Sequence, residues 1–423
     1  CLACDREVVF WNEAVDKVAG KILDKFHCPH CDAELTKKCI ERVWVQKYDG
    51  AISETINQAK QVPVLINYTF PKKRYEKEPD IFDTTLIENI EYLKISHVFP
   101  TKKLPEGYNT EQPRKSHGIT HVHHFYTNRN MNCVASFVAK VKNKRLIAAI
   151  TGVNSDVSRM ARVKIGYYFK GGGEPFIPGL SGTLYVPSLS VEKSVLFAIA
   201  NRITTFARSL PNFYSNNTLL TNNCGSNLIS CDSNSVDYIF TDPPFGGNIM
   251  YSELNFLWES WLKVFTKNQS EAIQSKSQEK GLNEYRYLIV QCFREAYRIL
   301  KPGRWITIEF SNTKASVWNA IQTALQESGF VVANVSALDK KQGSFKAVTT
   351  TTAVKQDLVI SAYKPTTALE ASLANQEEES VWDFVRSHLG NLPTVKEKHS
   401  NLSFIAERDP RILYDRMISY FFQ

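Results

Sequence analysis

The sequence predicts an α/β protein with a doubly wound sheet in its C-terminal half and a small metal-stabilised subdomain at its N-terminus. From Ser235 onward, apolar runs of strand length alternate with amphipathic stretches of helical length. This alternation is typical of a sheet that is covered by helices on both faces. Two closely spaced cysteine pairs near the N-terminus predict the metal-stabilised subdomain.

Length and composition are those of a globular protein of two or three domains. The chain has 423 residues, of which 43% are hydrophobic and 22% are charged. No apolar run approaches the roughly 20 residues of a membrane-spanning helix, and no secretory leader opens the sequence. Nine cysteines, an odd number, argue against a disulfide framework. We therefore expect a cytoplasmic protein with no membrane partner.

The cysteine pairs Cys1-Leu-Ala-Cys4 and Cys28-Pro-His-Cys31 are separated by 23 residues. Four thiolates suit tetrahedral zinc and leave no open coordination position, so the spacing predicts a structural site formed by Cys1, Cys4, Cys28 and Cys31. The neighbouring His27 and His30 are expected to be exposed rather than ligands. The segment 8–11 alternates and is expected to be a strand. The alternative is chance spacing in a reduced protein.

Residues 47–113 hold six prolines and are expected to form an irregular insertion with one strand at 62–68. Four histidines then follow within eight residues, at positions 117, 121, 123 and 124. Their spacing fits neither a zinc finger nor an H-E-x-x-H helix, and carboxylates are lacking nearby. A loop that faces solvent or nucleic acid is the favoured interpretation over a second metal site.

Residues 129–170 contain nine basic residues and one acid, a net charge of +8 that equals that of the whole chain. This concentration favours a polyanionic partner such as DNA, because each contacted phosphate releases counterions. The alternative is a solvated basic surface. The residues predicted to bind nucleic acid are Lys140, Lys142, Lys144, Arg145, Arg159 and Arg162.

The remaining elements are predicted from periodicity and breakers. Glu174-Pro175 follows the first three glycines of the cluster at 171–182 and cannot open a helix cleanly, so the cluster predicts a turn and not a dinucleotide cradle. Lys301-Pro302-Gly303 ends the predicted amphipathic helix 284–300. Helices are expected at 133–141, 191–209, 284–300, 317–327 and 381–388, and strands at 163–169, 236–240, 305–310, 330–335 and 357–363.

The sharpest motif is Asp242-Pro243-Pro244-Phe245, directly after the predicted strand 236–240. Carboxyl ends of strands are where α/β folds place their sites. A rigid Pro-Pro turn without catalytic role is the alternative interpretation.

The chemistry of an exocyclic base amine explains this combination of residues. Its lone pair is delocalised into the ring, which makes the nitrogen a poor nucleophile. The Asp242 carboxylate and the Pro243 carbonyl could each accept one amine hydrogen and so free the lone pair. Prolines hold the backbone rigid, and Phe245 would stack on a base flipped out of the duplex. Gly246 and Gly247 would permit close approach.

The motif resembles the catalytic motif of DNA amino-methyltransferases, and the stretch 241–262 is similar to that of the bacterial zinc-ribbon-containing adenine-specific DNA methylases. Asn248, Tyr251 and Trp261-Leu262 match positions typical of that family. Similar too are the cysteine pairs, Phe125-Tyr-Thr127, the unit at 284–310 and Leu413-Tyr-Asp-Arg416.

The resemblance implies a Rossmann-like class I methyltransferase sheet, here partial, with an inserted zinc ribbon. It implies S-adenosylmethionine as methyl donor, structural Zn²⁺, and DNA as partner. The expected domains are a zinc ribbon (1–46), an inserted basic region that recognises DNA (47–185), the catalytic core (186–365) and a C-terminal tail (366–423).

The sequence departs from the family at the cofactor loop. A loop of F-x-G-x-G type normally follows a strand and precedes the ribbon, yet none occurs before Asp242, and residues 366–423 hold a single glycine, Gly390. Since the chain also begins with Cys rather than Met, we expect the loop upstream of Cys1. Activity of this fragment alone is then not expected.

Four further functions stay open at this point. Methyltransferases acting on cytosine N4, an RNA base or a glutamine side chain use related motifs, usually opened by Ser or Asn where Asp242 stands. A non-catalytic nucleic-acid-binding protein is a different class, which an intact Asp242 argues against.

Overall fold

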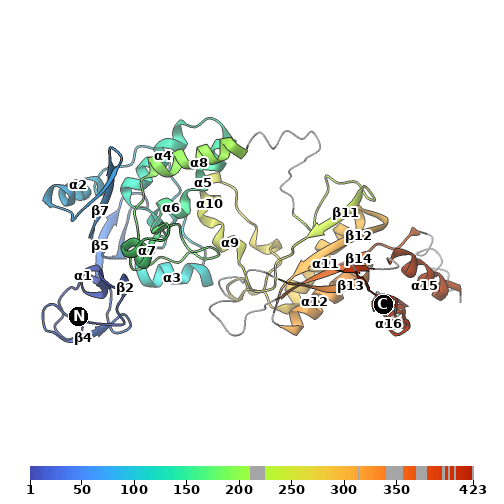
Figure 1. Ribbon diagram of the computed structural model, residues 1–423. Coiled ribbons are helices and arrows are strands. Elements are labelled where there is room, and N and C mark those ends of the chain that lie inside the picture. Colours follow the sequence, from blue (N-terminus) through green and yellow to red (C-terminus); the bar gives the residue numbers. More distant parts are fainter. Residues whose placement is uncertain are drawn as a thin grey trace. The chain divides into compact units, whose positions relative to one another are not determined.

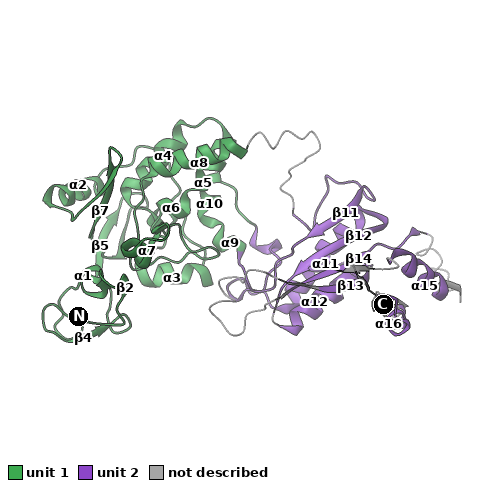
Figure 2. Cartoon of the chain, viewed as in Figure 1, with its two compact units in different colours: residues 1–218, 251–266 green, residues 219–250, 267–423 purple. Residues whose placement is uncertain are grey.

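The structure is a computed structural model of the chain (Figure 1). It describes residues 1–209, 224–312, 314–339, 356–367, 379–392, 396–398, 401–403 and 406–421. Two compact units are present: unit 1 comprises Cys1–Thr218 and Tyr251–Thr266, and unit 2 comprises Leu219–Met250 and Lys267–Gln423 (Figure 2). Both contain helices and strands, which confirms a mixed α/β protein. Within the described ranges, no helix is long and apolar enough to cross a membrane.

Unit 1 begins with a small subdomain around the cysteine pairs. Its core contains Ala14, Phe26, Cys28 and Leu35. Its elements are α1 (Phe10–Ala14), β1 (Val15–Asp16), β2 (Lys21–Ile22), β3 (Lys25–His27) and β4 (Glu34–Thr36), and β3 pairs antiparallel with β4. The strand predicted at 8–11 is wrong, because Trp11 and Ala14, three residues apart, are both buried on the one turn of α1.

The segment predicted to be irregular contains two antiparallel hairpins and two helices, so that prediction is wrong. The hairpins are β5 (Trp44–Asp49) with β6 (Glu54–Ala59), and β7 (Ile66–Phe70) with β8 (Lys73–Lys77). The prolines of this segment that lie outside the helices fall outside the four strands as well, where no ladder hydrogen bond is lost. The helices are α2 (Ile81–Glu91) and α3 (Tyr108–His117).

The rest of unit 1 is mainly helical. It comprises η1 (Val122–Phe125), α4 (Asn128–Lys140), α5 (Lys144–Thr151), α6 (Asn154–Val157), β9 (Arg162–Val163), α7 (Ile165–Lys170), β10 (Phe176–Ile177), α8 (Val195–Ser209), α9 (Tyr251–Leu254) and α10 (Phe256–Leu262). The strand predicted at 163–169 is instead mostly α7. Ile165, Tyr168 and Phe169 share one face of this helix at helical spacing and pack near Trp11.

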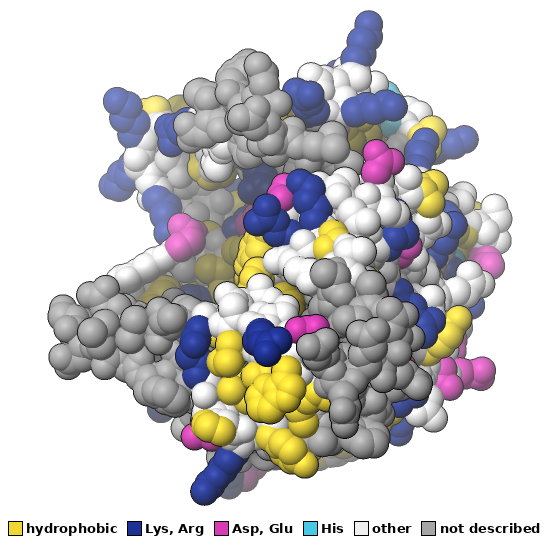
Figure 3. All heavy atoms as spheres, turned by 90° about the vertical axis from the view of Figure 1, so that its right-hand side faces the viewer, with side chains coloured by type: hydrophobic (Ala, Val, Ile, Leu, Met, Phe, Trp, Pro, Cys, Tyr) yellow, Lys and Arg dark blue, Asp and Glu magenta, His cyan; other side chains and the backbone are white. Residues whose placement is uncertain are grey.

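Unit 2 is built on one four-stranded sheet in the order β11-β12-β14-β13. β11 (Val236–Thr241) runs parallel to β12 (Leu300–Phe310), whereas β14 (Gln356–Tyr363) is antiparallel to both β12 and β13 (Val331–Asp339). β11 lies at one edge of this sheet in the described part of the chain, and Tyr238 and Phe240 on it are 55% and 60% exposed. On the face drawn in Figure 3, hydrophobic side chains gather beside Lys and Arg.

Helices cover both faces of the sheet, as predicted. The long α11 (Leu282–Ile299) and α12 (Ala315–Glu327) pack on one face, where Val332 and Ile360 contribute to the core. Val331 and Tyr363 face the other side and pack with Phe384 of α15 (Glu379–Asn391). Shorter elements are η3 (Asn268–Ser270), η4 (Lys276–Gln278), β15 (Lys396–Lys398), β16 (Asn401–Ser403), η5 (Ala406–Arg408) and α16 (Pro410–Phe421).

Candidate active site and metal centre

The Asp-Pro-Pro-Phe motif leaves the carboxyl end of β11. Because β11 and β12 are parallel, both strands end at the same edge of the sheet. Asp242 follows the last residue of β11, Thr241, and is exposed, whereas Pro243, Pro244 and Phe245 are half-buried. An exposed carboxylate beside a partly buried rigid turn can reach a substrate while its backbone stays fixed.

Two side chains from other elements hold the motif's backbone. Tyr285 of α11 is fully buried, and its hydroxyl donates to the Pro244 carbonyl at 2.7 Å. The Gly246 N–H donates to the same carbonyl at 3.0 Å. Asn312, after β12, donates through Nδ2 to the Phe245 carbonyl at 2.9 Å. Burial raises the pKa of Tyr285, so its hydroxyl stays protonated and remains a donor.

The ring of Phe245 packs edge-to-face on Phe310, with ring centroids 5.2 Å apart and planes at 81°. This contact fixes the ring between the core and the surface. Gly246 has a φ of +65°, and a Cβ there would lie 3.1 Å from Val317 Cγ1. Both the left-handed backbone and the close approach favour glycine. Sequence reasoning missed Tyr285 and Asn312, because neither lies in a motif; the only signal was the position of Tyr285 within the predicted helix.

The residues that follow the motif fold into unit 1. Trp261 of α10 is buried, and its Nε1 donates to the Tyr126 hydroxyl at 3.1 Å, with the two rings edge-to-face. Burial raises the pKa of Tyr126. Glu253 of α9 accepts hydrogen bonds from the backbone and side-chain nitrogens of Asn109 at 2.9 and 3.0 Å. The structure thus brings together two segments, 125–127 and 251–262, that carried the family resemblance.

The four predicted zinc ligands lie together. The Sγ atoms of Cys1 and Cys31 are 3.7 Å apart, as are those of Cys4 and Cys28, and all four lie within 4.8 Å of one another. A tetrahedral site with Zn–S bonds of about 2.3 Å places its sulfurs about 3.8 Å apart. The donor set therefore fits zinc in number, chemistry and spacing.

The turn of the second cysteine pair favours a thiolate at Cys28, whereas the neighbouring Cys28 and Cys4 contribute to raising the pKa of Cys31. Burial opposes ionisation of Cys28, but hydrogen bonds from the backbone N–H groups of His30 and Cys31 and from neighbouring thiols outweigh it and lower the pKa of Cys28 to about 7. His27 and His30 are exposed, and their ring nitrogens contact the backbone carbonyls of Asp32 and Glu7. Both therefore lie outside the cluster of sulfurs, as predicted.

The predicted basic patch divides into two groups. The first four of its residues are exposed where α4 ends and α5 begins: Lys140, Lys142, Lys144 and Arg145. Arg159 and Arg162 are only partly exposed, and the Nε of each is buried without a hydrogen-bond partner among the described residues. Burial lowers the pKa of Arg159. The α4–α5 turn is thus the part of the patch that is open to a polyanion.

The histidine segment is not the solvent-facing loop predicted above. His117 and His124 are 2% and 4% exposed, and His123 is nearly as buried in its side chain. His123 and His124 both contact Asp49, at the end of β5. That carboxylate is more than seventy residues away in sequence, which is why inspection of the neighbouring residues did not find it.

Residues 236–409, about two fifths of the chain, match a family model described as DNA methylase, of the N6/N4 type. Over these residues the chain is thus similar to DNA methylases. The match begins at the first residue of β11 and includes the Asp-Pro-Pro-Phe motif, the whole sheet and the covering helices α11, α12 and α15. No curated protein matches the chain.

Several solved structures are similar to part of the chain. One is a Thermus thermophilus protein named "putative DNA modification methylase", with 16% identity over 37% of this chain and 59% of that one and a TM-score of 0.20. Its complex with S-adenosyl-L-methionine gives 14% identity, 37% and 61% coverage and a TM-score of 0.19. The [4+2]-cyclase SpnF is 11% identical over 42% of this chain and 64% of its own, with a TM-score of 0.24. The chain spans about three fifths of the length of these proteins.

Proposed function

We propose that the chain is the target-base part of a DNA methyltransferase that modifies N6 of adenine with S-adenosylmethionine as donor. The observation that carries this proposal is the position of Asp242-Pro243-Pro244-Phe245 at the carboxyl end of β11, inside the DNA methylase match. Asp at the first position favours adenine over cytosine N4, an RNA base or an amide, whose enzymes usually have Ser or Asn there. The basic α4–α5 turn supports nucleic acid as the substrate.

The hydrogen bonds of the motif suggest how it acts on the amine. The Pro244 carbonyl already accepts from Tyr285 and Gly246, so both of its lone pairs are engaged. The Asp242 carboxylate and the Pro243 carbonyl are then the two acceptors for the amine hydrogens. Accepting both pulls the nitrogen toward tetrahedral geometry and frees its lone pair for attack. The proton lost from nitrogen leaves by way of Asp242 to water.

Phe245 supplies the platform for the extruded base. Stacking on an aromatic ring contributes about 1–3 kcal/mol per base. The edge-to-face contact with Phe310 holds the ring in one orientation, so little rotational freedom is lost when a base binds.

S-adenosylmethionine supplies an electrophilic methyl group. In the described part of the chain no strand is followed by an F-x-G-x-G loop, so we assign no residue here to hold it. The family resemblance is the support for this donor. The proposed domains are the ribbon at 1–46, the recognition region at 47–185, the core at 186–365 and the tail at 366–423. We propose that zinc binds the four cysteines and that DNA contacts the exposed basic residues Lys140, Lys142, Lys144 and Arg145.

The test is methyl transfer to duplex DNA by the full-length protein, with S-adenosylmethionine as donor. Asp242→Ala should lower kcat by at least about 10²-fold with little change in DNA affinity, because the carboxylate acts once the base is in place. Asp237→Ala, on the exposed surface of the same strand, is the control and should leave kcat unchanged. Wild-type turnover by Asp242→Ala would leave the motif a structural turn and refute the proposal.

Phe245→Ala should differ in kind from Asp242→Ala. It should weaken retention of the flipped base, and a mismatched target, whose base is easier to extrude, should partly restore its rate. The same mismatch should not rescue Asp242→Ala. Phe240→Ala removes an exposed ring of the same type from β11 and serves as the matched control. Transfer of methyl groups to cytosine instead of adenine would support the alternative substrate, cytosine N4.

A further inference from the structure

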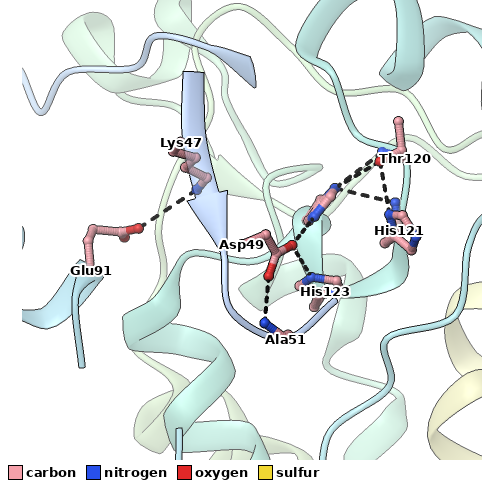
Figure 4. Close-up of polar contacts among 8 residues, drawn as sticks. Lys47, Asp49, Ala51, Glu91, Thr120, His121 and His123 are labelled. Carbon is pink, nitrogen blue, oxygen red and sulfur yellow. Dashed lines mark hydrogen bonds and ion pairs between the residues drawn. The ribbon is translucent and has the colours of Figure 1, made fainter. Parts of the chain in front are cut away.

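Asp49, His123 and His124 converge in unit 1 (Figure 4). The Nε2 atoms of both histidines lie 2.7 Å from one oxygen, Asp49 Oδ2. The side chains of Asp49, His123 and His124 are 9%, 10% and 3% exposed. Two imidazoles and a carboxylate that point at one place are a recurrent ligand set for divalent transition metals.

The donor atoms of this cluster suit a cation. His123 Nε2, His124 Nε2 and Asp49 Oδ2 offer two nitrogens and one oxygen within 4.8 Å of one another. A metal ion would take the place of the protons between them.

The surrounding contacts orient the donors. Ala51 N–H donates to Asp49 Oδ1 at 2.9 Å, which leaves Oδ2 directed at the histidines. The Thr120 hydroxyl lies 3.3 Å from His124 Nδ1. With metal on Nε2, the His124 proton would move to Nδ1, where this hydroxyl becomes its acceptor. Metal-bound histidines are commonly fixed by such a bond.

The change in geometry that a metal requires is small. Ligands at about 2.0–2.1 Å in a tetrahedral arrangement lie about 3.3 Å apart, so each 2.7 Å pair would open by about 0.6 Å. Two long contacts to His124 Nδ1, from the N–H groups of Thr120 and His121 at 3.3 Å each, would be given up. A metal-free cluster, in which protons bridge the imidazoles and the carboxylate, would keep those two contacts. This metal-free cluster is the alternative to metal binding.

We propose that Asp49, His123 and His124 bind a divalent transition-metal ion that joins the end of β5 to the segment at η1. The site is separate from the four cysteines and from the Asp242 motif. Because it closes a loop of more than seventy residues within unit 1, the metal should stabilise the folded unit. The inference does not depend on the methyltransferase proposal.

Cobalt distinguishes this site from the cysteine cluster. Metal-free wild-type protein titrated with Co²⁺ should take up two ions per chain. One gives thiolate-to-cobalt charge-transfer bands from the cysteines, and the other gives only the weak visible bands of nitrogen and oxygen ligands. Asp49→Asn, which keeps the shape and one acceptor of the carboxylate, should lose the second ion and keep the thiolate bands. His124→Gln should do the same.

The control is His97→Gln, which changes a histidine outside the cluster and should still bind two ions. Zn²⁺ added to the metal-free protein should raise the Tm of a Cys28→Ser background, and adding Asp49→Asn to that background should abolish the rise. A wild-type chain that saturates at one Co²⁺ with thiolate bands would overturn the proposal and show that protons hold the cluster together. Two ions in Asp49→Asn and in His124→Gln alike would overturn it as well.

Discussion

Tyr285 shows how a single buried hydroxyl can set the shape of the motif that we propose to be catalytic. It is part of the core beneath the sheet, yet its oxygen reaches the Pro244 carbonyl at 2.7 Å. The carbonyl that it occupies is one of two adjacent proline carbonyls, and occupying it leaves the other for substrate. In the proposed reaction, a residue that looks purely structural would therefore select which backbone oxygen accepts the amine hydrogen.

Tyr285→Phe keeps the ring in the core and removes only this donor. The free energy of unfolding should fall by about 0.5–1.5 kcal/mol, the usual net contribution of one hydrogen bond. The amides of Gly246 and Gly247 should exchange faster with solvent, because the turn loses one of its restraints. Denaturant unfolding and hydrogen exchange measure the two effects.

Tyr287→Phe is the matched control, since Tyr287 lies on the same helix and is 64% exposed. It should change neither stability nor exchange in the motif. Equal exchange at Gly246 in both variants would contradict the role assigned to Tyr285.

If the four cysteines bind zinc as proposed, the ribbon is the element whose stability depends most on one interaction. Its core is small, with four buried residues, one of which is Cys28. Small cores of this size are commonly stabilised by a metal. Losing the metal should therefore unfold the ribbon and leave the sheet of unit 2 intact.

Cys28→Ser should release zinc from the cysteine site and make the ribbon sensitive to proteases, with the far-UV signal of the sheet retained. Cys39→Ser is the control: Cys39 is exposed, lies in the same subdomain and contacts Thr36 rather than the other sulfurs. Metal content and limited proteolysis are the measurements. A Cys28→Ser protein that keeps a full complement of zinc in this site would count against the four-thiolate assignment.

At the level of elements, sequence reasoning succeeded where one period dominates. The pattern from 236 to 363 predicted β11, α11, β12, α12, β13 and β14 because apolar runs of strand length and one-sided helices differ clearly in period. It failed at 163–169, where an aromatic run packs as a helix against Trp11. It also failed at Asp49, since no local pattern reveals a contact between β5 and His123. The catalytic motif was visible because its residues are consecutive, whereas Tyr285 and Asn312 reach it only through the fold.

At the scale of the molecule, the charge that favours DNA is concentrated in unit 1, whereas the motif proposed to act on the base is in unit 2. Phosphate contacts contribute affinity that does not depend on sequence. Substrate affinity and base chemistry should therefore respond to different substitutions.

Reversing the charge of Lys140, Lys142, Lys144 and Arg145 should weaken binding to all DNA sequences alike and flatten its dependence on salt. The control reverses four exposed lysines spread over unit 1: Lys21, Lys72, Lys94 and Lys115. Both proteins carry the same net charge, so a difference between them reports position alone. Equal salt slopes for the two would mean that the α4–α5 turn is an ordinary solvated surface.

The order in which the chain is made differs from the order in which its units are completed. Tyr251–Thr266 belongs to unit 1 but is synthesised after β11 of unit 2. During synthesis, the hydrogen bond between Trp261 and Tyr126 cannot form until Trp261 has left the ribosome. Unit 1 therefore cannot finish folding before β11, the first described strand of unit 2, has emerged. During that interval β11 has left the ribosome without β12, with Tyr238 and Phe240 uncovered. A gene cut after residue 250 would therefore yield an unfinished unit 1, and the border between the two units is no place to divide this protein.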